Sequence, residues 1–418
     1  MLLGVAPARG PKETEEDLAE LSRLADTAGA IVVARVTQRR DHLDPGYFIG
    51  RGKADEIREM VGPHDVDVVI CDEDLSPGQV RNLEKIIGVK VVDRSELILD
   101  IFATRARTKQ ARLQVELAQL EYTLPRLKRM WTHLNRYEGG IGTRGPGEKQ
   151  LESDRRMVQK QIADLKHELK AIDERKMREV GSRKEFPLLS IVGYTNAGKS
   201  TLMNALTDAG VLVEDKLFAT LDTRTRRWKL DKHFTALVSD TVGFIRKLPH
   251  HLVASFRATL EEARHADLLL HVVDASHPEA MSQAEVVLET LNAIGCQDTP
   301  KLTVLNKEDL IEDPLVLVSL QRRFRDHVLV SALSGKGLER LRERVLEICT
   351  RQMVEVEIQV PVGDGRIHAM VTSEGRVLQE RHTSEMSVYR ALIKGDVAGR
   401  LRAMGATVRS TLGGKTDS

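Results

Sequence analysis

Eight consecutive residues carry the strongest structural signal in this chain: Gly193-Tyr194-Thr195-Asn196-Ala197-Gly198-Lys199-Ser200. They match the pattern G-x-x-x-x-G-K-S, with an apolar stretch at 188–192 before them and a helix-like stretch at 201–206 after them. A strand, a glycine-rich turn and a helix are the context that a phosphate-binding loop requires. Backbone N–H groups cradle the phosphates, Lys199 reaches the β- and γ-phosphates, and the Ser200 hydroxyl binds Mg²⁺. The sequence therefore predicts a site for a nucleoside triphosphate.

The composition is that of a multidomain globular protein. The chain has 418 residues, of which 41% are hydrophobic and 30% are charged, and single cores stop growing near 250–300 residues. No apolar run approaches the ~20 residues of a membrane span, and the N-terminus lacks the pattern of a secretory signal. Cys71, Cys296 and Cys349 are far apart and have no metal-ligand spacing. We expect a cytoplasmic protein with reduced cysteines and no stable membrane insertion.

We expect an α/β multidomain fold with four parts: a small N-terminal parallel α/β domain (1–103), an antiparallel helical hairpin with a basic glycine-rich tip loop (104–184), a P-loop G domain (185–351) and a small C-terminal α+β domain (352–418). In the first part, short β-branched runs at 31–34, 67–70 and 89–92 alternate with helical patterns at 54–61, 79–87 and 94–102. In the last part, strands at 354–361, 376–382 and 387–393 and helices at 366–373 and 396–404 suggest a split βαβ order. The stretch 50–53, Gly-Arg-Gly-Lys, is too short to indicate a second phosphate site, and a simple turn before a helix is favoured.

The hairpin is predicted from leucines that recur every three or four residues on both sides of a glycine-rich break. Pro125 is a misfit, because it removes a backbone donor and should kink the first arm. The segment from 101 to 184 has 20 Lys and Arg against 11 Asp and Glu, although the whole chain carries a net charge of only +1. A long arm with a flexible basic tip suits contact with structured RNA, while a solvated spacer is the simpler alternative. The candidate RNA contacts are Arg136, Gly139, Gly140, Arg144, Lys149, Arg155 and Arg156.

Two further motifs identify the base and the switch. Asp240-Thr241-Val242-Gly243 follows an apolar strand, so Asp240 can hold the hydration shell of Mg²⁺ and the Gly243 amide can sense the γ-phosphate. Asn306-Lys307-Glu308-Asp309 follows another apolar strand, and a carboxylate at Asp309 accepts two hydrogen bonds that guanine offers and adenine does not. Ser331-Ala332-Leu333 can offer a backbone N–H to the base oxygen. The order of these motifs predicts GTP and GDP as ligands.

The G domain resembles the translation-factor-related GTPases, and several motifs resemble the HflX family in particular. These motifs are Phe218-Ala219-Thr220-Leu221-Asp222-Thr223, the run from Asp240 to Pro249, and the tip sequence from Gly139 to Glu148. The resemblance spans about 72–334 and implies that Phe218, Ala219, Thr220, Leu221 and Asp222 belong to the GTP site. On this likeness, Thr220 binds Mg²⁺ together with Ser200 and, through water, Asp240. The residues expected to act on the γ-phosphate are Lys199, Thr220, Gly243 and Asn196.

The resemblance also implies a cytosolic GTPase that binds the large ribosomal subunit and its RNA, places its hairpin near the peptidyl-transferase centre, and splits stalled or idle ribosomes under stress. An Asn at position 196 can hold K⁺ against the phosphates in related GTPases, whereas a plain loop amide is the alternative. Leu333 stands where a Lys often packs in this class, so only its backbone should contribute.

Phe244 occupies the position where many small GTPases place a Gln that orients the attacking water. A phenyl ring cannot polarise water, so we expect slow hydrolysis by the free protein and stimulation by ribosomes. Two alternatives stay open: a GTP-regulated ribosome-assembly or RNA-remodelling factor, and a stand-alone GTPase whose hairpin is a dimerising coiled coil. We expect a monomer when the protein is free.

Overall fold

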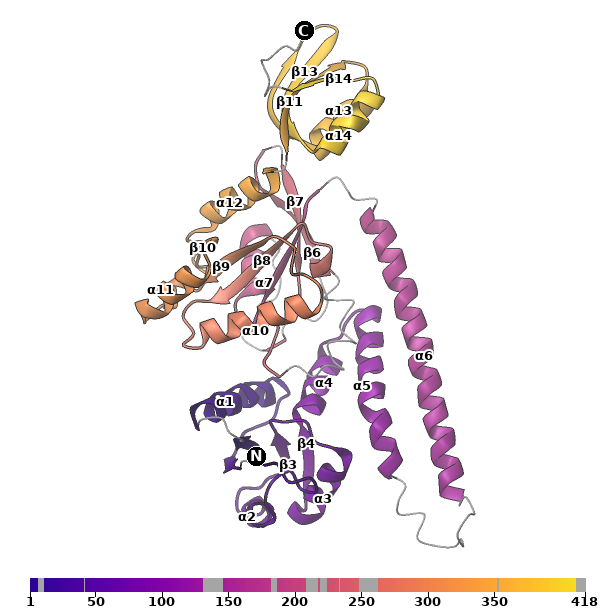
Figure 1. Ribbon diagram of the computed structural model, residues 1–418, viewed down its shortest axis with the longest axis vertical. Helices are drawn as coiled ribbons and strands as arrows, with labels where there is room; N and C mark the ends of the chain where they lie inside the picture. The colour runs from indigo at the N-terminus through magenta and orange to yellow at the C-terminus, as the bar shows by residue number, and fades with distance from the viewer. Residues whose placement is uncertain are drawn as a thin grey trace. The chain divides into compact units, whose positions relative to one another are not determined.

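The computed structural model describes residues 1–6, 11–40, 42–130, 146–181, 186–207, 217–218, 224–232, 234–247, 262–351 and 353–410. These residues form two compact units (Figure 1). The first comprises 1–173, 214–222 and 247–257, and the second comprises 174–213, 223–246 and 258–418. Three separate sheets confirm the predicted α/β multidomain fold.

The N-terminal domain has a wholly parallel four-stranded sheet in the order β2-β1-β3-β4. Its strands are β1 (Leu2–Ala6), β2 (Arg35–Arg39), β3 (Val68–Cys71) and β4 (Lys90–Asp93), and its helices are α1 (Pro11–Thr27), α2 (Arg51–Val61), α3 (Pro77–Ile87) and α4 (Arg94–Arg105). The predicted strand at 31–34 is wrong: these residues form a loop in which Ile31 is 88% exposed, and the strand begins at Arg35. Strand β1 and helix α1 were not predicted from the sequence. The stretch 50–53 starts helix α2 with Gly50 as its N-cap, and Lys53 forms an ion pair with Glu56 at 2.7 Å.

A buried carboxylate joins this domain to the first arm of the hairpin. Asp93 ends β4 and caps α4 by accepting from the Glu96 N–H at 2.9 Å. The same carboxylate accepts from the Tyr122 hydroxyl at 2.8 Å and from the Arg126 guanidinium at 2.8 Å. Since a buried charge must be paired and hydrogen-bonded, these contacts fix the hairpin arm on the domain.

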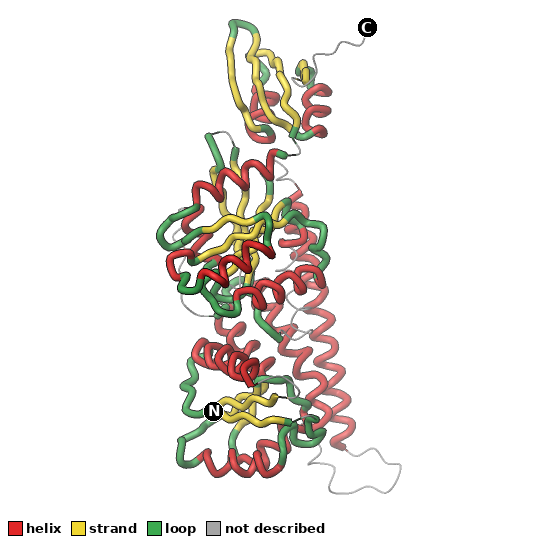
Figure 2. The backbone as a smooth tube through the Cα atoms, turned by 60° about the vertical axis from the view of Figure 1, so that its left-hand side comes forward, coloured by secondary structure: helices red, strands yellow, loops and turns green. Residues whose placement is uncertain are grey.

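The helical hairpin consists of α5 (Lys109–Met130) and α6 (Pro146–Gly181). Leu117, Leu165 and Leu169 are the buried centre of its seam, as the leucine spacing predicts. Ion pairs Lys109–Glu168 (2.6 Å) and Lys166–Glu121 (2.8 Å) also join the two arms. In Figure 2 the two helices run side by side. Pro125 lies inside a helix that continues to Met130.

The G domain has a six-stranded sheet in the order β10-β9-β8-β5-β7-β6, in which only β6 runs antiparallel to its neighbour. The strands are β5 (Leu188–Gly193), β6 (Arg224–Lys229), β7 (Thr235–Asp240), β8 (Leu268–Asp274), β9 (Lys301–Asn306) and β10 (His327–Leu329). Helices α7 (Lys199–Thr207) and α12 (Leu338–Thr350) cover one face, and α10 (Ala280–Ala293) and α11 (Pro314–Arg323) cover the other.

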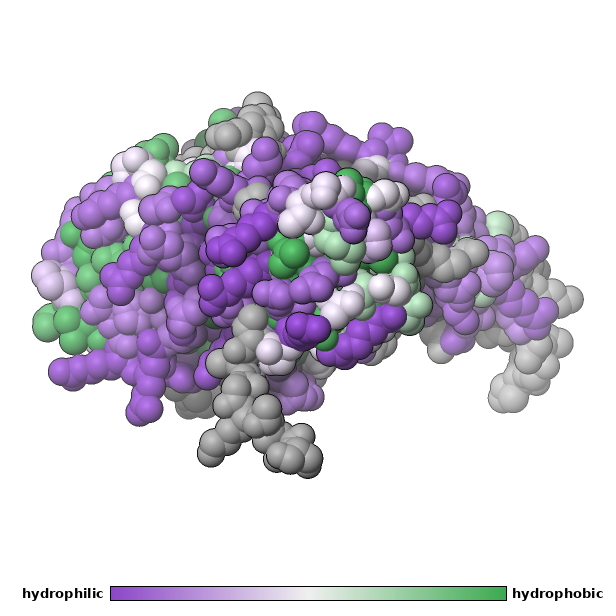
Figure 3. Space-filling view, turned by 90° about the horizontal axis from the view of Figure 1, so that it is seen from above, coloured by the Kyte–Doolittle hydropathy of each residue, from purple (hydrophilic) through white to green (hydrophobic). Residues whose placement is uncertain are grey.

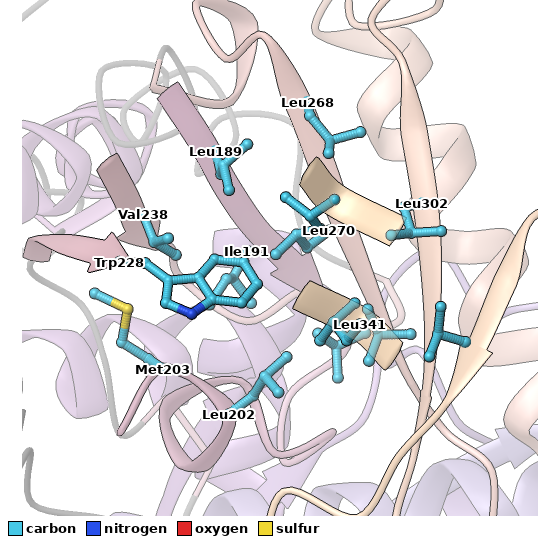
Figure 4. Packing of buried hydrophobic residues seen from close by; sticks show 14 of the residues in the cluster. Leu189, Ile191, Leu202, Met203, Trp228, Val238, Leu268, Leu270, Leu302 and Leu341 are labelled. Atoms are coloured by element: carbon cyan, nitrogen blue, oxygen red, sulfur yellow. The ribbon is translucent and has the colours of Figure 1, made fainter. Parts of the chain in front are cut away.

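Aliphatic side chains fill the core between the sheet and the α7–α12 face. Trp228 adds the one indole of this cluster and lies against Met203, Ile191 and Val238 (Figure 4). Burial of so large a side chain is worth several times that of a methyl group, and it holds the edge strand β6 on the sheet.

The C-terminal domain is an antiparallel sheet in the order β12-β13-β11-β14 with two helices on one face. Its elements follow the predicted β-α-β-β-α-β order: β11 (Val354–Pro361), α13 (Gly365–Glu374), β12 (Arg376–His382), β13 (Met386–Ile393), α14 (Gly395–Ala403) and β14 (Thr407–Ser410). The molecular face in Figure 3 is mainly hydrophilic, with apolar residues in small separate areas. Among the described residues, no helix combines the length and the apolar character that a membrane span needs.

Candidate nucleotide-binding site

The predicted phosphate loop lies between the carboxyl end of β5 and the first turn of α7. Gly198 has φ +89°, and a Cβ built on it would lie 2.3 Å from the Asn306 Nδ2 atom. Only glycine fits both this left-handed backbone and this close contact. Asn196 also has a left-handed backbone, with φ 61°, and its side chain is exposed. The loop therefore turns sharply enough to direct its backbone amides to one side.

Lys199 and Asp240 are buried charged residues of the phosphate-loop site. The Lys199 ammonium is 6% exposed and donates to the Tyr194 carbonyl at 2.8 Å. Burial lowers its pKa to about 8, while the nearby Asp240 acts in the opposite direction. A bound polyphosphate would favour the charged ammonium, because opposite charge raises a lysine pKa.

Ser200 and Asp240 supply a donor set that fits Mg²⁺. The Ser200 hydroxyl donates to the Asp240 carboxylate at 2.8 Å, and Asp240 is 2% exposed. Mg²⁺ prefers hard oxygen ligands and is usually bound through one or two protein groups together with substrate phosphates. A hydroxyl from the first turn of α7 and a carboxylate from the end of β7 meet this requirement. Thr220, the third expected ligand, lies outside the described residues, as do Ala219, Leu221 and Asp222.

The segment after Asp240 is joined to the phosphate loop by backbone bonds. Phe244 donates its N–H to the Gly193 carbonyl at 3.1 Å and accepts from the Thr195 N–H at 2.7 Å. The Phe244 ring is 2% exposed. A Cβ on Gly243 would lie 2.7 Å from the Thr195 Cγ2 atom and 2.9 Å from the Lys199 Nζ atom, so this position too admits only glycine. Thr241 and Val242, the two residues between Asp240 and Gly243 in this motif, are also buried.

Arg246 anchors this segment at a second point, which the sequence analysis missed. Its N–H donates to the Tyr194 hydroxyl at 2.9 Å, and its guanidinium donates to Glu279 at 3.0 Å and to the Ser282 hydroxyl at 2.6 Å. Glu279 and Ser282 lie at the start of α10. No local motif announces this contact, since the partners are more than 30 residues apart.

The predicted base-binding loops meet the phosphate loop through Asn306. Its amide donates to the Ala197 carbonyl at 2.9 Å and accepts from the Ala332 N–H at 3.0 Å. This is the link between the loops that the sequence predicts. The amide of Ser331 is also engaged, with the Lys336 carbonyl at 2.9 Å. Leu333 is 82% exposed, and its N–H has no partner within the described part of the chain.

Lys307 and Asp309 differ in how they are held. Lys307 has φ 63° and pairs with Asp274 at 2.7 Å. Asp274 was not predicted, although an acid directly after the apolar strand at 268–273 was the available signal. Glu308 turns toward Lys336, at 2.7 Å. The Asp309 carboxylate is exposed and forms no hydrogen bond or ion pair with a described residue, so it is open to a ligand.

The structure does not place the remaining predicted residues among these loops. Phe218 belongs to the first unit, where its ring is 4.7 Å from that of Phe102. Arg136, Gly139, Gly140 and Arg144 lie outside the described residues, and the side chain of Lys149 is also outside them. Arg155 is half-buried on α6, and Arg156 pairs with Glu152 at 2.7 Å.

Three family models match the chain. Residues 15–103 match "GTP-binding GTPase N-terminal", 105–183 match "GTP-binding GTPase Middle Region", and 189–307 match "50S ribosome-binding GTPase". The protein called GTPase HflX in Lacrimispora saccharolytica is 43% identical over 401 residues, which cover 95% of this chain and 94% of that protein. GTPase HflX of Escherichia coli is 44% identical over 359 residues, covering 85% and 84%. A crystal structure of SsGBP with GDP is 28% identical, with a TM-score of 0.48, covering 84% of this chain and 98% of that one.

Proposed function

The chain belongs to the HflX family of GTPases and hydrolyses GTP, and from this premise we propose that it is a cytoplasmic factor that binds the large ribosomal subunit and splits stalled or idle ribosomes. The observation that carries the proposal is the match of residues 189–307 to a family described as a ribosome-binding GTPase. The basic, leucine-seamed hairpin that precedes this domain in the chain supports it, because a long cationic arm suits RNA.

In this proposal the phosphate loop, Gly193 to Ser200, binds the triphosphate, and Lys199 neutralises the β- and γ-phosphates. Ser200, Thr220 and, through water, Asp240 hold Mg²⁺, which offsets the charge on the phosphate oxygens. Asp309 accepts from the guanine N1–H and 2-amino groups, while the Lys307 stem covers the face of the base. Because the amides of Ser331 and Ala332 are engaged, the Leu333 N–H is the one that would donate to the base oxygen.

Hydrolysis by the free protein should be slow. Phe244 is buried, and its backbone is bonded to the phosphate loop, so its side chain does not orient a water molecule. The ribosome then orders or supplies what the free enzyme lacks. Single-turnover hydrolysis that proceeds as fast without ribosomes as with them would contradict this.

Asn196 is the proposed K⁺ contact. Its backbone is left-handed and its side chain is exposed, which supports access of an ion to it. A K⁺ ion there would add positive charge near the transferring phosphate. Exchange of K⁺ for Na⁺ at constant ionic strength should slow hydrolysis, and equal rates in the two salts would rule out this role.

The γ-phosphate would act as the switch. With GTP and Mg²⁺ bound, Thr220 and the Asp240–Gly243 segment would be ordered and would complete a ribosome-binding face, and hydrolysis would release the protein. The tip residues Arg136, Gly139, Gly140, Arg144 and Lys149, with Arg155 and Arg156, then contact ribosomal RNA.

Sucrose-gradient profiles of 70S-type ribosomes with GTP, GDP or a non-hydrolysable analogue test the proposal. We expect co-migration with large subunits and loss of the 70S peak with GTP and the analogue, but not with GDP. Binding to precursor particles without loss of 70S would instead indicate an assembly factor. Deletion of residues 139–147 should abolish the ribosome response and leave the free protein monomeric and able to bind GTP; conversion of a dimer to a monomer by this deletion would indicate a dimerising coil.

A further inference from the structure

The edge strand of the G-domain sheet carries a dense run of positive charge that the nucleotide site does not use. Strand β6 reads Arg224-Thr225-Arg226-Arg227-Trp228-Lys229. Trp228 is buried in the core, whereas Arg226, Arg227 and Lys229 are exposed. Within the described part of the sheet, β6 pairs with β7 alone. Its other edge therefore presents unpaired backbone groups beside the cations.

Among the described residues, no acid compensates these charges. Arg224, Arg226, Arg227 and Lys229 form no ion pair with any residue that the structure describes. The acid in the following turn, Asp231, pairs instead with Arg376 at 2.6 Å. Four like charges on a six-residue strand repel one another, so they cost rather than add stability. An anionic partner would remove this repulsion.

A hollow of about 550 Å³ opens beside the exposed cations, within the range of ~300–1,000 Å³ that is usual for ligand sites. Apolar side chains of Phe186, Leu206 and Leu338 line it, with the cations of Arg227 and Lys229. Arg342 also lines the hollow, but it forms an ion pair with Glu339. The Arg227 guanidinium lies over the Phe186 ring, 5.3 Å from its centroid. A flat guanidinium held on an aromatic face is a surface on which a nucleobase stacks.

We propose that β6 and this hollow form a binding surface for single-stranded RNA, with phosphates on Arg226, Arg227 and Lys229 and one unpaired base in the hollow. Cations along a strand combined with an aromatic stacking site are the features that bind single strands. A membrane surface would need exposed apolar side chains among the cations, but the aromatic residue of β6 is buried. The surface rests on the proposed function for RNA as partner and adds a second contact to that of the hairpin tip.

The position of the strand ties this surface to the nucleotide site. Arg224 lies opposite Asp240 in the β6–β7 register, so RNA on β6 lies within one strand length, about 17 Å, of the predicted Mg²⁺ ligand. The strand also begins two residues after the segment 218–222. The proposed RNA contacts and the residue paired with Asp240 therefore lie on the same strand.

The test uses the full-length chain and a fluorescein-labelled 20-nucleotide oligo(U) RNA, with affinity measured by anisotropy at several salt concentrations. In the charge variant, Arg226, Arg227 and Lys229 are all changed to Gln. We expect affinity to fall about 10-fold or more near 0.1 M salt, and the slope of log affinity against log salt to decrease by about 2, at ~0.7 per phosphate contact. The matched control changes Arg366, Arg381 and Arg409 to Gln. These are exposed cations of the C-terminal domain that form no ion pair with a described residue, and both affinity and slope should stay near those of the parent.

A second variant separates the hollow from the charge. Ala205→Trp fills the hollow and should weaken binding about 5-fold or more while leaving the salt slope unchanged, because stacking is worth about 1–3 kcal/mol per base. GDP affinity, unchanged in all variants, shows that the G domain is folded. If the charge variant binds oligo(U) like the parent, the proposal is wrong and the cations serve only to protect an edge strand. If a poly-glutamate peptide displaces the RNA while Ala205→Trp has no effect, the partner is an acidic protein and the proposal is equally wrong.

Repeating the RNA measurements in the 139–147 deletion distinguishes this inference from the proposed function. Loss of affinity on charge removal in both backgrounds supports the β6 surface, whatever the gradients show. A normal ribosome response from a charge variant with unchanged RNA affinity would overturn the β6 surface alone.

Discussion

The buried imidazole of His271 gives a stability prediction that can be worked in numbers. His271 lies in the middle of β8, is 1% exposed and packs edge-on against Phe324 with ring centroids 5.7 Å apart. Neither ring nitrogen has a hydrogen-bond partner within the described residues. Burial, with a smaller effect of the Lys301 charge, lowers the pKa of His271 from 6.5 to about 4. The fold therefore holds this ring neutral at a cost that grows in acid.

The sign and size follow from proton linkage. Between the folded pKa of about 4 and the unfolded pKa of 6.5, the unfolded chain binds more protons than the fold, so the free energy of unfolding falls as pH falls through this window. From pH 8 to pH 5 the loss assigned to His271 is about 2 kcal/mol. Replacement by Leu, which has a similar volume and no titrating group, should remove this loss.

Trp228 makes the measurement specific to the G domain. The chain has two tryptophans, and Trp131→Phe leaves Trp228, 4% exposed in the G-domain core, as the sole indole reporter. Urea unfolding followed by its fluorescence at pH 8, 7, 6 and 5 gives the stability of parent and His271→Leu. The stability of the variant minus that of the parent should become more favourable by about 2 kcal/mol as pH falls from 8 to 5. His265→Gln, at an exposed position of the same domain, is the control and should follow the parent. An equal loss of stability with acid in parent and His271→Leu would refute the reasoning.

Three further predictions concern the nucleotide site. Asp309→Asn should weaken GDP binding about 100-fold, because charge-assisted hydrogen bonds to guanine are lost. The control Glu308→Gln, at a carboxylate that pairs with Lys336, should change GDP affinity less than about 3-fold. Equal effects of the two variants in competition titrations would show that Asp309 does not bind the base. Gly198→Ala should lower GDP affinity at least about 10-fold, since a Cβ would collide with Asn306 in a left-handed backbone; Gly335→Ala has a similar φ and open space around it, and matching losses in the two variants would show that the collision is irrelevant. The Lys199 pKa of about 8 predicts uptake of about half a proton on GDP binding at pH 8, and calorimetric enthalpies that do not differ between buffers of different protonation enthalpy would contradict it.

Sequence reasoning failed where an element depends on distant partners. The loop at 31–34 begins with three β-branched residues, yet Ile31 and Val33 lie exposed, and the strand forms instead at Arg35–Arg39, where β1 provides a parallel edge. Strand β1 itself pairs with β2 and β3 across 33 and 68 residues. No local propensity encodes such a pairing. Likewise β6 carries four cations and one buried residue, and it becomes a strand only because β7 lies beside it.

Local chemistry was readable without coordinates because each nucleotide motif needs only its own strand and turn. The glycines, lysine and acids of the motifs at 193–200, 240–243 and 306–309 can be recognised directly in the sequence. Because the strands before these motifs are parallel, their carboxyl ends lie at one edge of the sheet. Which groups meet at that edge was a matter of packing. Three features depend on this packing: the backbone bond of Phe244 to Gly193, the Arg246–Glu279 contact and the neutral His271. Each involves residues far apart in the chain that the fold brings into contact, and a local sequence pattern cannot predict such contacts.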